Sequence, residues 1–364
     1  MTNLIRLAPR VLFISAVCLM FASMLVGQTP RARKTTKKVV PVATDSIAAS
    51  PNTPSVNPCA GHPLGAGKGN CRLREAIDVD GDGKADFGIF RPSENTWYYA
   101  KSTGGLFGAQ WGLANNDFMT PGDFDGDGKG DIAVWRDDTG DWFWINSSDG
   151  TMHGVHWGLS GDEPVARDYD GDGKTDLAVV RRSGGQMIWY VLRSSDGVPF
   201  GIQYGLSTDY TCPGDYDGDG KFDFAVQRPG ATAGSNATFF ILNSSNGTLT
   251  AAQFGLSNDL VVPGDYDGDG KTDIAVVREG ATPSANLEWY ILRSSDGGFT
   301  GLYWGLTGYD YPTQNDYDGD GKTDVAIWRD SDGNFYTLNS SNNTMGGIQW
   351  GLPNDYPVAT YDTH

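Results

Sequence analysis

The chain has 364 residues, 50 of them glycine, and a formal net charge of −18 at pH 7. This net acidity argues against a nucleic-acid partner, because phosphate groups are bound by clustered lysines and arginines. Helical periodicity is absent after residue 70, so the sequence also excludes an α-helical domain in its larger part.

The first 27 residues have the pattern of a secretory signal peptide. Arg6 and Arg10 precede an apolar stretch over residues 11–26, and Gly27 follows near the expected cleavage site. An uncleaved membrane anchor is the alternative, although the apolar stretch is slightly short for a membrane span. Cleavage predicts a secreted, extracellular or cell-surface protein whose mature chain has no membrane span.

Residues 28–70 are expected to form a flexible linker. They are first basic and then rich in Pro, Ser, Thr and Ala, a composition that cannot bury a core. An oxidising compartment would allow a disulfide between Cys59 and Cys71, which would tie the linker to the following domain. Cys212 occupies a position where other repeats carry Thr or Val, so it is interpreted as a small buried apolar residue.

Residues 71–364 are dominated by a nine-residue motif, D-x-D-G-D-G-K-x-D, that occurs six times. Its first aspartate recurs at intervals of 45, 45, 47, 50 and 51 residues, a period typical of propellers and solenoids. Twenty-four of the 45 acidic residues lie in these six motifs, so the acidity of the chain is mostly a property of the repeats.

Each motif has the donors and the flexibility that a divalent cation requires. Carboxylates stand at positions 1, 3, 5 and 9, the glycines at positions 4 and 6 permit unusual backbone angles, and the lysine at position 7 offers its carbonyl oxygen. Oxygen-only donors predict Ca²⁺, because Mg²⁺ usually retains several waters. An acidic, solvated turn is the alternative, and six identical copies argue against it.

The predicted calcium ligands form six sets, for about six bound ions. Each set contains four aspartates and one lysine, which contributes its backbone carbonyl. In chain order the sets are Asp78, Asp80, Asp82, Lys84 and Asp86; Asp123, Asp125, Asp127, Lys129 and Asp131; Asp168, Asp170, Asp172, Lys174 and Asp176; Asp215, Asp217, Asp219, Lys221 and Asp223; Asp265, Asp267, Asp269, Lys271 and Asp273; and Asp316, Asp318, Asp320, Lys322 and Asp324.

The residues after each motif exclude an EF-hand, which needs a glutamate at position 12 and a following helix. Position 12 is Ile or Val in all six copies, within short apolar runs such as Ile274–Val277. These runs predict buried strands, so each calcium loop joins two strands.

Two further strands complete each repeat. An aromatic-aliphatic strand such as Trp189–Leu192 precedes a Ser-Ser-Asp-Gly turn, and the next strand ends in aromatic-Gly-Leu, as at Trp304–Leu306. Four short antiparallel strands per repeat predict an all-β propeller with the calcium loop between the first two strands of each blade. We expect six blades, with residues 356–362 completing the first. Seven blades are the alternative, because residues 72–77 could form an additional strand.

The aromatic-Gly-Leu ending, the acidic loop and the apolar strand together resemble the FG-GAP or VCBS-type repeat family, which includes the calcium-bearing propellers of integrin α subunits. The resemblance covers residues 71–364 and implies a propeller whose loop aspartates bind Ca²⁺. The Gly-Ala-Pro element of the family survives only in part, at residues 230–233 and 280–283. Neither an inserted domain nor a C-terminal membrane helix is expected from this sequence, so integrin partners are not transferred to this chain. The family includes adhesins, lectin-like modules and some enzymes, so it predicts function poorly.

No catalytic residues are assigned from the sequence. The four histidines are His62, His153, His156 and His364; the middle two are three apart on one strand, so they face opposite sides and cannot bind one ion together. We expect a non-catalytic extracellular module that binds a glycan or a protein. The alternatives are a secreted enzyme that degrades polysaccharides or phosphodiesters, and a structural envelope or matrix protein.

Three features are candidate ligand contacts, and each has a structural alternative. Longer loops at residues 229–238 and 279–287 indicate either a binding face or neutral variation. The turn before each inner strand holds one carboxylate, which either lines a channel mouth or caps its turn: Asp117, Asp162, Asp209, Asp259, Asp310 and Asp355. Recurring tryptophans either stack on sugars or pack between blades: Trp97, Trp142, Trp144, Trp189 and Trp289. Trp135 and Trp328 are expected in the core.

Overall fold

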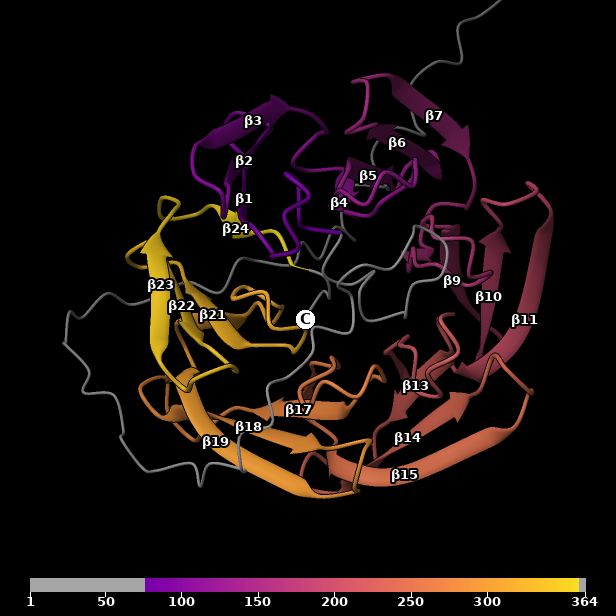
Figure 1. Cartoon of the computed structure of the whole chain (residues 1–364). Coiled ribbons are helices and arrows are strands. Elements are labelled where there is room, and N and C mark those ends of the chain that lie inside the picture. The colour runs from indigo at the N-terminus through magenta and orange to yellow at the C-terminus, as the bar shows by residue number, and fades with distance from the viewer. Residues whose placement is uncertain (1–75, 360–364) are drawn as a thin grey trace, which may run out of the picture. The chain divides into compact units, whose positions relative to one another are not determined.

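Each repeat folds into one four-stranded antiparallel sheet, and six such sheets form a β-propeller (Figure 1). The computed structural model describes residues 76–359. The predicted signal peptide, the linker and the pair Cys59 and Cys71 lie outside the described residues. Within residues 76–359, no helix has the length and hydropathy needed to cross a membrane.

The strands of each blade follow the chain from the innermost to the outermost, except that the innermost strand of the first blade comes from the end of the described chain. From inside to outside, the blades are β24 (Tyr356–Pro357), β1 (Phe87–Arg91), β2 (Thr96–Ala100) and β3 (Leu106–Gln110); β4 (Asp117–Met119), β5 (Ile132–Arg136), β6 (Asp141–Ile145) and β7 (Met152–His156); β8 (Glu163–Pro164), β9 (Leu177–Ser183), β10 (Gln186–Leu192) and β11 (Pro199–Leu206); β12 (Tyr210–Thr211), β13 (Phe224–Arg228), β14 (Asn236–Leu242) and β15 (Leu249–Leu256); β16 (Leu260–Val261), β17 (Ile274–Arg278), β18 (Asn286–Leu292) and β19 (Phe299–Leu306); and β20 (Asp310–Pro312), β21 (Val325–Arg329), β22 (Asn334–Leu338) and β23 (Met345–Gln349).

The ring closes through β24, which lies beside β1 in Figure 1. Phe90 pairs with Tyr356 in antiparallel register, and the N–H of Val358 donates to the carbonyl oxygen of Gly88 at 2.9 Å. This pairing confirms the prediction that the C-terminal repeat completes the first blade. The seven-blade alternative is wrong, because β24 already fills the inner position of that blade, and residues 76–77 lie in a turn. Residues 72–75 and 360–362 lie outside the described part.

The aromatic residues of the second and third strands form the core between neighbouring blades. Four tryptophans have no exposed surface, and each indole N–H donates to a carbonyl at the end of its own outer strand at 2.8–3.1 Å: Trp97, Trp142, Trp189 and Trp289. Trp135 and Trp328 are also fully buried. The packing interpretation of these residues is therefore confirmed, and they are not available to stack on a ligand.

Trp144 differs from the other tryptophans because it is only half-buried. Its ring stacks on Phe124, with the centroids 5.3 Å apart, and on His153, with the centroids 5.0 Å apart. Cys212 is fully buried, as expected, and burial raises the pKa of its thiol. Both residues therefore contribute to packing.

Candidate metal centres

In five blades the acidic loop connects the innermost strand to the second strand; in the first blade, residues 78–86 precede β1, and the innermost strand β24 comes from the other end of the chain. In the second blade, the N–H of Asp131 donates to the carbonyl oxygen of Gly122 at 2.7 Å, which closes the loop as a hairpin. The loop glycines adopt left-handed backbone angles, with φ of +81° at Gly126 and +83° at Gly128. Residues with a Cβ rarely adopt such angles, so both glycines are required for this turn.

Backbone amides hold the loop carboxylates in place. Oδ1 of Asp123 accepts the N–H of Gly126 at 2.6 Å, and its Oδ2 accepts the N–H of Gly128 at 2.9 Å. Asp131, at the other end of the loop, accepts the N–H of Phe124 at 2.8 Å. These bonds recur in the other loops, so the sequence itself specifies the loop conformation.

The structure brings the predicted aspartate ligands together. In the first loop, carboxylate oxygens of Asp78, Asp80 and Asp86 lie within 4.8 Å of one another. In the sixth loop, the charges of Asp316 and Asp318 act on Asp324. The third and fourth loops group the same positions, as Asp168, Asp170 and Asp176, and Asp215, Asp217 and Asp223; the second and fifth group positions 1, 3 and 5, as Asp123, Asp125 and Asp127, and Asp265, Asp267 and Asp269.

This donor set fits a hard divalent cation. Oδ1 of Asp80 is buried and has no hydrogen-bond partner among the described residues. Leaving a buried carboxylate oxygen unpaired is costly, and a cation in the loop would remove that cost. All side-chain donors are oxygens, which matches Ca²⁺. The contribution of the lysine carbonyls at position 7 stays a prediction.

The last aspartate of each loop is almost completely buried, with at most 1% of its surface exposed. Burial, together with the charges of neighbouring loop carboxylates, raises the pKa of this carboxyl from 3.8 to about 7 in all six copies. The six residues are Asp86, Asp131, Asp176, Asp223, Asp273 and Asp324. A metal ion would therefore compete with protons near neutral pH.

The Ser-Ser turns between the third and fourth strands contact the acidic loops, which the sequence did not predict. In the second blade, the N–H of Ser147 donates to Oδ1 of Asp131 at 2.7 Å, and the hydroxyl of Ser148 donates to Oδ2 of Asp125 at 2.5 Å. A Ser or Thr makes the second contact in every blade. The signal available in the sequence was the recurrence of both serines, which a turn alone does not require. We call this side of the propeller the metal-loop end.

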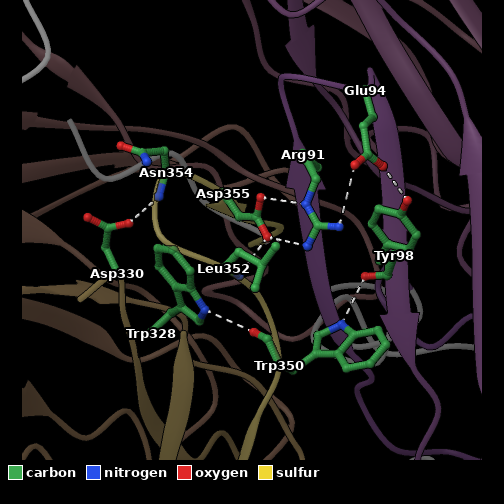
Figure 2. Close-up of polar contacts among 9 residues, drawn as sticks. All are labelled: Arg91, Glu94, Tyr98, Trp328, Asp330, Trp350, Leu352, Asn354 and Asp355. Atoms are coloured by element: carbon green, nitrogen blue, oxygen red, sulfur yellow. Dashed lines mark hydrogen bonds and ion pairs between the residues drawn. The ribbon is translucent and has the colours of Figure 1, made fainter. Parts of the chain in front are cut away.

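The opposite side, the arginine end, carries the single aspartates that precede the inner strands. Figure 2 shows Asp355 in the first blade, where Arg91 donates from Nε to Oδ1 at 3.0 Å and from Nη2 to Oδ2 at 2.9 Å. The N–H of Leu352 also donates to Oδ2, at 2.8 Å, and the guanidinium lies 4.7 Å from the ring centroid of Tyr98. Each aspartate therefore caps its turn and is ion-paired.

The same arrangement occurs in all six blades. The other five pairs are Asp117 with Arg136, Asp162 with Arg181, Asp209 with Arg228, Asp259 with Arg278, and Asp310 with Arg329. Each arginine also stacks on an aromatic ring of the third strand at 4.5–4.9 Å. These carboxylates do not form an open acidic ring, and turn capping is the correct alternative. The sequence signal was an arginine at the equivalent position, at or near the end of the second strand, in each blade.

The remaining sequence candidates are separated in the structure. His153 stacks on Trp144, whereas Nδ1 of His156 lies 2.9 Å from Oδ1 of Asp141, so the two histidines have different partners, as expected. The longer loops at the arginine end are held by the following turns. The hydroxyl of Ser257 accepts the N–H of Gly230 at 2.7 Å, and Thr307 does the same for the equivalent loop of the fifth blade.

Comparison with known proteins agrees with the repeat architecture. The FG-GAP-like repeat family matches residues 78–134, 168–226 and 215–276. None of the curated proteins compared matches this sequence.

Similar solved structures include a mutant of AofleA from Arthrobotrys oligospora, which is 12% identical with a TM-score of 0.46 over 80% of this chain and 90% of that chain. Inactive virginiamycin B lyase from Staphylococcus aureus, with quinupristin, is 12% identical with a TM-score of 0.43 over 75% of this chain and 88% of that chain. At these values the likenesses carry no argument about function. Three segments of this chain therefore match the FG-GAP-like repeat, and its described residues form a six-bladed β-propeller.

Proposed function

We propose that this chain is an extracellular, calcium-stabilised binding module, secreted or tethered to the cell surface, whose ligand is a glycan or a protein. The metal-loop end supports the calcium part of this proposal. Each of its six loops gathers buried carboxylates whose mutual repulsion a divalent ion would relieve. Binding of Ca²⁺ to the folded chain alone would stabilise the fold.

Exposed aromatic side chains on the innermost strands carry the binding part of the proposal. Four blades place an aromatic residue at the same position, one residue after the arginine-paired aspartate. These side chains are 41–49% exposed: Phe118, Tyr210, Tyr311 and Tyr356. Aromatic side chains with one exposed face bind sugars and protein side chains well, and their repetition around one axis would add avidity.

The arginine end also presents exposed apolar residues. Leu113, Leu159 and Leu352, from the aromatic-Gly-Leu segments, are 46–55% exposed. The single aspartates at this end are committed to arginines. The exposed aromatic and apolar side chains of this end support binding of a ligand.

Ligand binding by the mature chain tests the proposal. We expect binding to an array of glycans or extracellular proteins in Ca²⁺, and loss of binding when Tyr210, Tyr311 and Tyr356 are all replaced by Ala. Tyr303→Ala is the matched control, because Tyr303 is 57% exposed on the outer strand β19. Equal loss in the control would place the ligand elsewhere, and hydrolysis of a polysaccharide or phosphodiester would favour the enzyme alternative.

A further inference from the structure

Neighbouring acidic loops are joined by a backbone hydrogen bond. The N–H of Gly130, at position 8 of the second loop, donates to the carbonyl oxygen of Asp78, at position 1 of the first loop, at 2.9 Å. The other five bonds, at 2.6–2.9 Å, run from Thr175 to Asp123, Phe222 to Asp168, Thr272 to Asp215, Thr323 to Asp265 and Ala85 to Asp316. The last of these links the first loop to the sixth, so the loops form a closed ring of their own.

The lysine at position 7 makes a second contact in the same direction. A Cβ added to Gly81 of the first loop would stand 2.9 Å from Cε and 3.1 Å from Cγ of Lys129, which belongs to the second loop. The aliphatic stem of this half-buried lysine therefore covers the backbone at position 4. The equivalent pairs are Lys174 over Gly126, Lys221 over Gly171, Lys271 over Gly218, Lys322 over Gly268 and Lys84 over Gly319.

Both contacts act on the part of the loop that positions the candidate ligands. Gly81 lies between Asp80 and Asp82, and its N–H donates to Oδ1 of Asp78 at 2.7 Å. The carboxylate of Asp78 therefore accepts a hydrogen bond from its own loop, and its carbonyl oxygen accepts one from the next blade. The hydrogen bond from Gly130 and the contact with Lys129 both come from the second blade, although they act on the loop of the first.

We propose that each calcium loop is completed by the next blade. The lysine stem and the position-8 N–H of one loop set the backbone conformation of the loop before it, and with it that loop's calcium affinity. In this arrangement Lys129 is a positioning residue for the first loop, and Lys84 for the sixth. The inference rests on the proposed calcium binding. By linkage, an ion in one loop also favours binding in the adjacent loop, so calcium fills the ring cooperatively.

Hydrogen–deuterium exchange of the full chain over a calcium titration tests this assignment, because it reports on each loop separately. In Lys129→Ala, we expect the calcium midpoint for protection of residues 78–86 to rise roughly tenfold, as is common when a group supporting a metal ligand is removed. Lys129→Met keeps the unbranched stem and should restore most of the affinity. The loop at residues 265–273 serves as the internal control, since it is not adjacent to either altered loop.

A second pair of variants checks the direction of the effect. Lys84→Ala should weaken calcium binding by residues 316–324, across the ring closure. If Lys129→Ala does not fold, Lys129→Gln, which keeps part of the aliphatic stem, should still raise the calcium midpoint of residues 78–86, by less than the roughly tenfold rise expected for alanine. A shift confined to residues 123–131 in the Lys129 variants would overturn the inference, as would unchanged midpoints in residues 78–86. Absence of calcium protection in every loop of the unaltered chain would instead contradict the proposed calcium binding itself.

Discussion

The two ends of the propeller use buried aspartates in opposite ways. At the metal-loop end, several aspartates converge in each loop, and burial raises the pKa of the last one. At the arginine end, one aspartate per blade is paired with an arginine of the same sheet. The same residue type therefore gives one end candidate sites for an ion from solution, whereas at the other end arginines of the protein itself neutralise the aspartates.

Removal of divalent ions should produce the largest difference between the two ends. One calcium site filled at 100 times its dissociation constant contributes about 2.7 kcal/mol of stability. With six sites, we expect a chelator to lower the melting temperature by more than about 10 °C, and added Ca²⁺ to restore it. An unchanged melting curve, or a metal analysis that finds no bound ion after dialysis against Ca²⁺, would contradict the proposed role of the loops.

The pH dependence of thermal stability should be the next largest effect, and calcium should change its direction. In the metal-free protein, the six buried carboxyls have a pKa of about 7, above the ordinary value of 3.8, so the folded state retains protons that the unfolded chain releases. Their contribution to stability is fully present below about pH 4 and is lost as the pH rises through 7. We expect the metal-free protein to melt at least about 5 °C higher at pH 5 than at pH 8.

With saturating Ca²⁺, protons compete with the ion, so the stabilisation that calcium adds should instead be larger at pH 8 than at pH 5. Differential scanning calorimetry at both pH values, with and without chelator, measures the two trends in one series. Parallel curves under the two conditions would show that these carboxyls do not bind the ion.

Breaking one pair at the arginine end should have a smaller effect that does not depend on calcium. The carboxylate of Asp310 is fully buried against Arg329, whose side chain is 20% exposed. Asp310→Ala leaves the guanidinium and the N–H of Leu306 without this acceptor and should cost about 2–4 kcal/mol. Asp296→Ala, which breaks an exposed pair with Arg293, is the control and should cost less than about 1 kcal/mol.

Denaturant unfolding with and without Ca²⁺ should give the same loss for Asp310→Ala under both conditions. If Asp310→Ala lowered the free energy of unfolding only in the presence of Ca²⁺, the arginine end would be coupled to the metal loops. The two ends would then not differ in their dependence on calcium.

A buried glutamine beside the arginine end should give the smallest effect. Gln227 has no exposed surface, and neither polar atom of its amide has a hydrogen-bond partner within residues 76–359. Other blades place Phe90, Trp135 or Val277 at this position in the second strand. Gln227→Met removes the unpaired amide at similar volume, so we expect stability to rise by about 1 kcal/mol in thermal or denaturant melts. A loss of stability would indicate that the amide has a partner such as a bound water.

The repeated segments of the chain made much of the fold predictable. The acidic loops, the β-branched runs and the aromatic-Gly-Leu endings are local patterns, and they indicated the four strands, the six blades and the closure by β24. The aspartates of each loop were also identified, because their spacing lies within nine residues.

Contacts between distant parts of a repeat were not predictable in the same way. Arg136 and Asp117 are 19 residues apart, and Ser148 and Asp125 are 23 apart, so neither pair forms a motif. The contact of Lys129 with Gly81 depends on how one blade docks on the next, which no single repeat specifies. Four of the five candidate sugar-stacking tryptophans are completely buried, which confirms packing between blades over ligand stacking for these four.

The closure of the first blade by β24 affects how the protein is made. A chain that has emerged only as far as Leu352 presents β1 with an unpaired inner edge, and such edges pair readily with other strands. During synthesis, that edge stays open until β24 is made. Truncations in this short final segment should therefore lower yield through aggregation, even though they remove none of the acidic loops.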